Sequence, residues 1–121
     1  MKTQRTSGTD MLGSLLDSRR DIEDCGRETS EGFKHWAREC RKYIKRSCKV
    51  LKFSIGHYYW DVFVEGKNAQ VWYISISDVR YFPDSPIIYR TAKNSKNYSG
   101  LSFGANRQVS AGQLTQVLQG L

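Results

Sequence analysis

Hydrophobic residues recur along this chain with two different periods. In the first 48 residues they fall three or four positions apart, which is typical of amphipathic helices. This spacing predicts one helix over 10–25 and a second over 30–48, with Gly26 ending the first and Thr29 or Ser30 capping the second. We expect the two helices to form an antiparallel hairpin.

The second predicted helix has one apolar and one basic side. At about 100° per residue its apolar residues share one arc, and the cations occupy the opposite arc. The apolar arc comprises Phe33, Trp36, Ala37, Cys40, Tyr43, Ile44, Ser47 and Cys48. Such a helix is expected to pack on the protein's own core and to show positive charge to an anionic partner.

From Val50 onward the hydrophobic period changes to two, as in β-strands. Alternating runs predict strands within 50–55, 58–64, 71–76 and 86–91. The first of these strands is expected to place three apolar side chains on one face, namely Leu51, Phe53 and Ile55.

Turn-forming residues separate these runs. Gly56 marks either a bend in one long strand or a break between two, and residues 65–68 predict a hairpin turn. The polar stretch 92–108 is expected to form loops or short edge strands, and 110–121 a short closing helix.

These elements predict an α+β fold in which an N-terminal helical hairpin packs on an antiparallel β-meander, followed by a short C-terminal helix. A length of 121 residues fits one domain over 1–121, with 1–9 expected to be flexible.

The charge of the chain is concentrated in the second helix and the start of the first strand. Residues 34–52 hold eight basic side chains and one acidic one, so this segment alone carries the +7 of the whole protein. A purely structural explanation is neutralisation by the first helix, which is acidic. The other explanation is an anionic partner, with nucleic acid as one candidate.

Composition narrows the class of protein. No apolar run reaches the length of about 20 residues that a membrane span needs, and the first residues lack a signal-peptide pattern, so we expect a cytoplasmic protein without a membrane partner. The three cysteines show no metal-binding spacing and are expected to be reduced, buried thiols. We therefore expect neither a metal nor a cofactor.

Catalytic signals are sparse. His35 falls on the basic arc and is expected at the surface, and His57 beside the predicted bend has no partner motif. Metal-free ribonuclease chemistry remains an alternative, because basic and phenolic side chains can stabilise a transition-state phosphate. Candidates for that role are His57, Arg80, Arg90, Lys93 and Tyr98.

The stretch 90–107 combines cations, amides, hydroxyls, aromatic edges and glycines. Phosphate attracts such cations, and a nucleobase stacks on flat rings and hydrogen-bonds to amides. An ordinary polar loop would have a similar composition. If the stretch does bind a nucleotide, our phosphate candidates are Arg27, Arg90 and Arg107, and our stacking candidates are Trp72 and Phe82.

The length, the order of elements and the region from Phe82 to Arg107 together resemble the phage Thoeris anti-defence sponges, the first-described family of that kind. The resemblance implies a non-enzymatic protein that captures cyclic ADP-ribose isomers, and in some members cyclic oligonucleotides at separate sites, as a dimer or larger oligomer. It further implies that Phe82 stacks on adenine, Asn94 bonds a base or ribose edge and Arg107 holds phosphate. Ala105 and Asn106 would line a second pocket.

Our prediction from the sequence is therefore sequestration of a nucleotide-derived immune signal without catalysis. Fifteen aromatic residues, several of them crowded into 58–73, further predict at least a dimer. The alternatives are a nucleic-acid-binding protein that uses the basic helix 30–48, a metal-free ribonuclease toxin, and a protein inhibitor whose basic face mimics or blocks a nucleic-acid partner.

Overall fold

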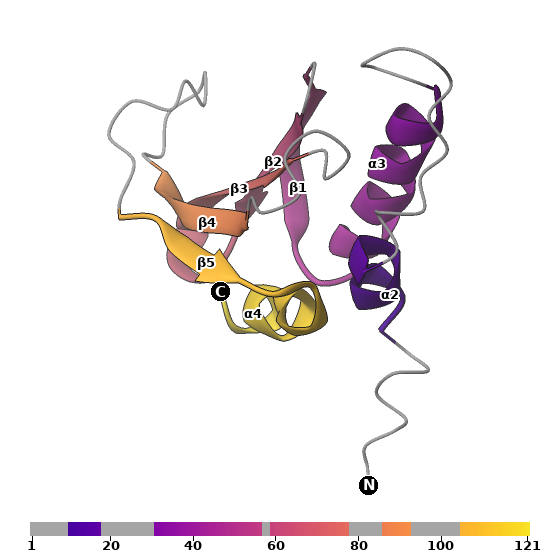
Figure 1. Cartoon of the computed structure of the whole chain (residues 1–121). Coiled ribbons are helices and arrows are strands. Elements are labelled where there is room, and N and C mark those ends of the chain that lie inside the picture. Colours follow the sequence, from indigo (N-terminus) through magenta and orange to yellow (C-terminus); the bar gives the residue numbers. More distant parts are fainter. Residues whose placement is uncertain (1–9, 18–30, 57–58, 78–85, 93–104) are drawn as a thin grey trace, which may run out of the picture.

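The computed structural model describes residues 10–17, 31–56, 59–77, 86–92 and 105–121. These residues form an α+β fold with a five-stranded antiparallel sheet in the order β1-β2-β3-β4-β5, so each strand pairs with its neighbour in the sequence (Figure 1). The strands are β1 (Lys49–Ile55), β2 (Tyr59–Glu65), β3 (Val71–Ser77), β4 (Ile87–Ala92) and β5 (Arg107–Val109). The helices are α2 (Met11–Asp17), α3 (Glu31–Ile44) and α4 (Leu114–Gly120), with short 3-10 turns η2 (Lys67–Ala69) and η3 (Ala111–Gln113). The predicted fold class is confirmed.

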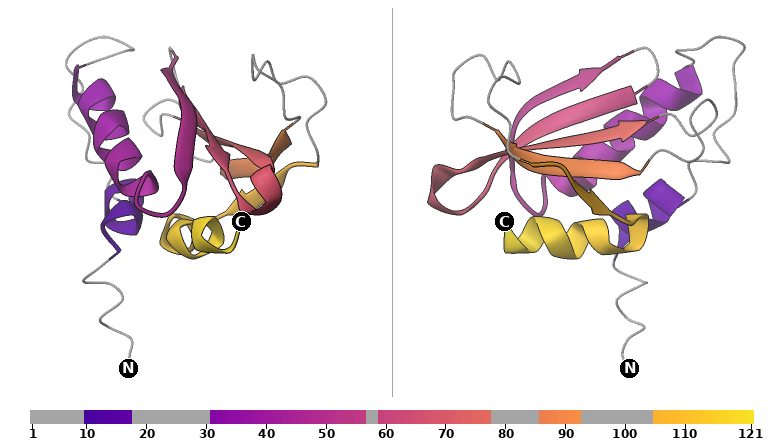
Figure 2. Two further views of the ribbon diagram at one scale, coloured as in Figure 1. Left: turned by 180° about the vertical axis from the view of Figure 1, so that it is seen from behind. Right: turned by 60° about the vertical axis from the view of Figure 1, so that its left-hand side comes forward.

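One face of the sheet forms the main core together with the described helices α2, α3 and α4. Figure 2 shows α2 and α3 beside the sheet and α4 crossing below it. The buried residues of this core from the strands are Trp60, Val62, Val64, Ile74, Ile76, Ile87 and Val109. From the helices they are Leu12, Leu16, Phe33, Trp36, Ala37, Cys40, Ile44, Leu114 and Leu118.

The two-sided character predicted for the second helix is confirmed. Five residues of the predicted apolar arc are buried in α3, and His35 is exposed on the other side. Trp36 donates its indole N–H to the carbonyl of Leu15 at 2.8 Å, which joins α3 to α2. The helix ends at Ile44 rather than at residue 48, because a turn follows it and β1 already begins at Lys49.

Only the first part of the predicted N-terminal helix lies within the described residues, as α2. Asp10 precedes α2 and accepts a hydrogen bond from the backbone N–H of Gly13 at 2.9 Å, as an N-cap does. The same carboxylate accepts a bond of 2.6 Å from the hydroxyl of Thr115, so the start of α2 is fixed to α4. Residues 1–9 and 18–30, with the predicted caps Thr29 and Ser30, lie outside the described residues.

A bulge in β1 overturns one prediction for that strand. Val50 pairs with Val64 and Lys52 pairs with Phe63, so Leu51 is an extra residue between two successive pairs. Phe53 therefore packs on the main core, as does Ile55, whereas Leu51 packs with Phe63 on the other face. The prediction of one shared face was wrong because it assumed an unbroken period of two.

Two glycines fit their turns for different reasons. Gly56 follows β1 and donates its N–H to the carbonyl of Tyr59 at 2.7 Å, so it stands at a break between two strands rather than in one long strand. Gly66 lies in the predicted hairpin turn between β2 and β3, where a Cβ would lie 2.8 Å from the carbonyl carbon of Leu121. The next residue, Lys67, donates its N–H to the carbonyl oxygen of Leu121 at 2.8 Å, so this turn holds the end of α4.

The face of the sheet opposite the helices carries a second, smaller apolar cluster. Its buried members are Phe63, Val71 and Ala92, with Leu51 and Tyr73 packed against them. The aromatic residues whose crowding predicted a dimer lie in different places. Trp60 is fully buried on the helix face, Tyr73 lies on this face, and Tyr59 is exposed. Tyr58 is outside the described residues. An oligomer stays a prediction.

Two cysteines lie within the described residues, and both are free thiols. Burial raises the pKa of Cys40 to about 12 and that of Cys48 to about 11, so both are expected to stay protonated and unreactive. No helix of the described residues is long and apolar enough to cross a membrane.

Candidate functional site

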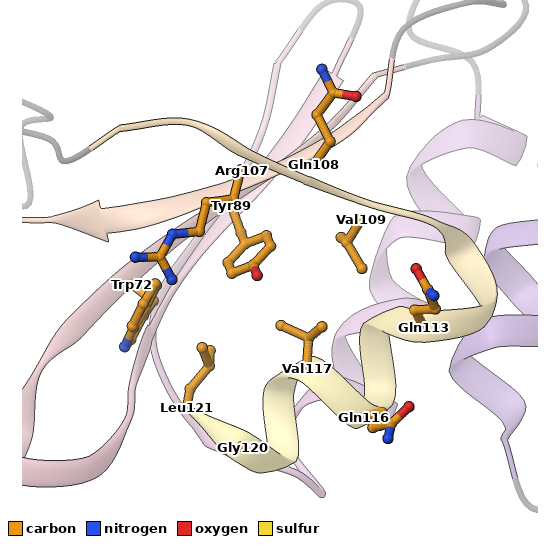
Figure 3. Close-up of a pocket in the computed structure, with 10 residues that line it drawn as sticks. All are labelled: Trp72, Tyr89, Arg107, Gln108, Val109, Gln113, Gln116, Val117, Gly120 and Leu121. Carbon is orange, nitrogen blue, oxygen red and sulfur yellow. The ribbon is translucent and has the colours of Figure 1, made fainter.

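A pocket of about 620 Å³ opens between α4 and the β3–β5 part of the sheet (Figure 3). It lies on the helix face of the sheet. Its lining residues are Trp72, Tyr89, Arg107, Gln108, Val109, Gln113, Gln116, Val117, Gly120 and Leu121. The pocket exists because the short β5 leads through η3 directly into α4, which returns along the sheet.

Two aromatic rings form the sheet side of this pocket. Trp72 of β3 and Tyr89 of β4 lie diagonally across the strand pair, because Ile74 is opposite Tyr89 and Thr91 is opposite Trp72. Their ring centroids are 5.9 Å apart and their planes are tilted by 36°. Both residues are only half-buried, so part of each ring is open to a ligand.

Arg107 brings a positive charge to these rings. It pairs with Tyr89 in the sheet register, and its guanidinium carbon lies 5.3 Å from the centroid of Trp72 and 6.0 Å from that of Tyr89. This cation–π contact orients a planar group that still has N–H donors available for an anion. None of the residues that line the pocket in the described part of the chain is acidic.

The opposite side of the pocket is apolar with amide groups beside it. Val117 and Leu121 are four residues apart and face the sheet together from α4 and its end (Figure 3). Gln113 and Gln116 lie on the helical side, whereas the side chain of Gln108 points away. Gln113 accepts a hydrogen bond of 3.0 Å from the Ser110 hydroxyl through its amide oxygen, which leaves its NH₂ group as a donor.

The described lining of this pocket combines aromatic surfaces with hydrogen-bond donors and acceptors. Flat rings, a guanidinium and amides recognise a base and a phosphate. Within the described lining, Tyr89 and Arg107 are the titratable side chains, and none of the described lining side chains is a carboxylate, histidine or lysine.

The structure brings together two of the residues predicted from the sequence and separates others. Trp72 and Arg107 meet in the pocket. Arg90 lies on the opposite face, with its guanidinium 4.9 Å from the ring centroid of Tyr73, and it donates a hydrogen bond of 2.8 Å to the side-chain oxygen of Asn106. Arg90 and Arg107 therefore belong to two different surfaces.

The remaining predicted site residues lie outside this pocket or outside the described residues. Ala105 is exposed next to Asn106 and does not line the pocket. Three candidates lie outside the described residues, namely Arg27, Phe82 and Asn94. The same holds for four of the five ribonuclease candidates, namely His57, Arg80, Lys93 and Tyr98.

Sequence reasoning missed Tyr89 and the contribution of α4. The alternation of β4 places Tyr89 on the same face as Ile87, which was a usable signal for its direction. The register between β3 and β4, which sets Tyr89 beside Trp72, could not be read from the residues because the connection 78–86 is too long to specify a tight turn that would fix the pairing.

The face of the sheet opposite the helices holds a separate polar group around Asp61. The hydroxyl of Tyr73 donates a hydrogen bond of 2.8 Å to Oδ2 of Asp61. Burial raises the pKa of Asp61 above its usual range, against the smaller effects of this bond and of the Lys52 charge. Burial, followed by the contact with Asp61, raises the pKa of Tyr73 to about 12. The described residues contain no group of three or more His, Cys, Asp or Glu side chains that could hold a metal ion.

Comparison with known proteins identifies no relative of this chain. No protein-family model, no curated protein and no solved structure matches the chain.

Proposed function

We propose that this protein binds a nucleotide-derived ligand in the pocket between α4 and the sheet and holds it without chemical change. The observation that carries the proposal is the position of Arg107 over the rings of Trp72 and Tyr89 in a pocket with no acidic lining residue. A cation beside a flat aromatic surface matches a ligand that has both a phosphate and a base.

The dimensions and polarity of the pocket agree with such a ligand. A volume of about 620 Å³ is within the range of about 300–1,000 Å³ that is usual for small-molecule sites. In this proposal a base stacks on the exposed part of Trp72 or Tyr89, and Arg107 turns its N–H donors to a phosphate. Gln113 and Gln116 then select the edge of the base or the ribose.

The biological role that we propose is sequestration of a nucleotide-derived immune signal, which blocks antiphage defence. The resemblance to the phage Thoeris anti-defence sponges supports cyclic ADP-ribose isomers as the ligand class, because these molecules carry adenine and two phosphates. A cytoplasmic protein that acts by stoichiometric binding needs a pre-organised site, since ordering a free arginine side chain would cost about 1 kcal/mol.

Calorimetric titration of the protein with cyclic ADP-ribose isomers tests this proposal. We expect Trp72→Leu and Arg107→Gln each to weaken binding by about tenfold or more, which is about 1.4 kcal/mol. The matched control is Arg46→Gln in the turn after α3, because the Arg46 guanidinium also lies over a ring, 4.6 Å from the centroid of Tyr43, and does not line the pocket. Equal weakening in all three variants would contradict the proposed site.

A further inference from the structure

A second cavity lies on the basic side of the molecule, between α3 and β1. Its volume is about 290 Å³, and its lining residues are Arg41, Lys45, Val50, Leu51, Lys52 and Phe53. We name it the α3–β1 groove. It shares no residue with the pocket beside α4.

Three cations converge on the α3–β1 groove without an acidic lining residue. Arg41, Lys45 and Lys52 form no salt bridge with any described residue, whereas Lys42 pairs with Glu39 at 2.8 Å. The acid that acts on Lys52 is Asp61, which lies beyond ion-pair distance. The groove therefore has an excess of positive charge.

Arg41 is held in place for anion binding by its surroundings. Its guanidinium carbon lies 5.0 Å from the centroid of the Phe53 ring, and its buried Nε forms no hydrogen bond with the described residues. A buried donor without a partner costs free energy, so a ligand oxygen that reached it would be favoured. Arg41 also stands in the last turn of α3, where the helix dipole favours a cation in the free protein.

More cations extend this groove along the surface. Arg38 and Lys42 lie on the exposed side of α3, and Lys45 is exposed in the turn that follows the helix. Lys49, which lies 3.8 Å from Glu65, continues the row into β1. A row of cations suits a chain of phosphates better than a single anion.

We propose that the α3–β1 groove binds a phosphate of a nucleic-acid backbone, with the cations along α3 holding the adjacent phosphates. This site is independent of the proposed nucleotide pocket. A membrane surface fits less well, because the apolar side of α3 is buried in the core and the exposed large hydrophobic residues of the described chain, Met11 and Tyr59, do not line the groove.

Fluorescence anisotropy with a labelled single-stranded oligonucleotide of about 20 nucleotides tests the proposal over a salt series. We expect Arg41→Gln and, separately, Lys45→Glu to weaken binding about tenfold and to reduce the slope of log affinity against log salt by about one. Lys45 is exposed, so its replacement preserves folding if Arg41→Gln does not. The control is Lys67→Gln, an exposed lysine in η2 outside the groove.

Three results would overturn the proposal. The first is no binding to the oligonucleotide at low salt. The second is an equal loss in the Lys67→Gln control. The third is binding to phosphatidylserine vesicles that depends on Arg41 and Lys45 while the oligonucleotide does not bind. Unchanged binding of cyclic ADP-ribose isomers in the Arg41 and Lys45 variants distinguishes failure here from failure of the pocket.

Discussion

Arg107 and Arg90 show how much the function of a residue depends on the face of the strand that it occupies. The sequence presents both as equivalent phosphate candidates. In the structure, Arg107 lies over Trp72 and Tyr89 beside α4, whereas Arg90 lies over Tyr73 on the opposite face and bonds to Asn106. The residue type therefore predicts that each arginine can bind a phosphate. The pairing of the strands decides on which face of the sheet each arginine lies.

A second prediction for a single residue concerns Asp61, on the face of the sheet opposite the helices. Because burial raises its folded pKa above the ordinary value of 3.8, its contribution to stability is full below 3.8 and is lost as the pH rises through the raised pKa. We therefore expect Asp61→Asn to raise the urea midpoint relative to the wild type at pH 7, with an advantage that shrinks as the pH falls through the raised pKa of Asp61 and is gone below 3.8. The amide oxygen can still accept the bond from Tyr73.

The control for this prediction is a variant of Glu39, for which we expect the change in the urea midpoint at pH 7 to have the opposite sign. The hydrogen bond from Lys42 lowers the pKa of Glu39, so Glu39 stabilises the protein above its ordinary pKa of 4.5 and this stabilisation is lost as the pH falls through the lowered value. Glu39→Gln should therefore lower the urea midpoint slightly at pH 7, since exposed pairs contribute little. An advantage of Asp61→Asn that grows on acidification would contradict the account of the buried carboxyl.

At the scale of elements, several predictions that rest on a pattern within one segment are confirmed, whereas features that depend on contacts between segments, such as the bulge in β1 and the docking of α4, were not predicted. The amphipathic period of α3 and the alternation of β2 and β3 are local, and the structure confirms both. The bulge at Leu51 shifts the pairing by one residue, and no local signal marks it. The pocket depends on how α4 docks beneath β3–β5, and β3 and β4 are far from α4 in the sequence.

The docking of α4 on the β2–β3 turn can be tested at Gly66. A Cβ there would lie 2.8 Å from the carbonyl carbon of Leu121 and 2.9 Å from its oxygen, so Gly66→Ala must displace the end of α4. We expect a loss of roughly 1–3 kcal/mol in the free energy of unfolding by urea titration. Ligand affinity should also fall, because Leu121 lines the pocket.

Gly112→Ala is the matched control for this change, because a Cβ at Gly112 would meet nothing within 4 Å. It should leave both the stability and the affinity close to those of the wild type. If Gly66→Ala unfolds at the same urea concentration as Gly112→Ala, the contact between the turn and Leu121 does not hold α4 in place.

At the scale of the whole molecule, one small domain presents two chemically different surfaces. The pocket beside α4 combines aromatic rings with a single guanidinium, and the α3–β1 groove combines several cations with one ring. The concentration of charge in 34–52 predicted an anionic partner for the groove side, and the composition of 90–107 together with Trp72 led to the pocket. The two proposed ligands share phosphate, so each site must be tested with its own variants.

Retention of a ligand by the folded protein tests the central claim most directly. The purified protein is incubated with a mixture of cyclic ADP-ribose isomers and cyclic oligonucleotides, washed and denatured, and the released molecules are identified by mass spectrometry. A double variant carrying Trp72→Leu and Arg107→Gln is treated in parallel. We predict that the wild type releases an intact nucleotide and that the double variant releases much less. An empty wild-type protein, a chemically altered ligand, or equal release from both proteins would contradict the claim.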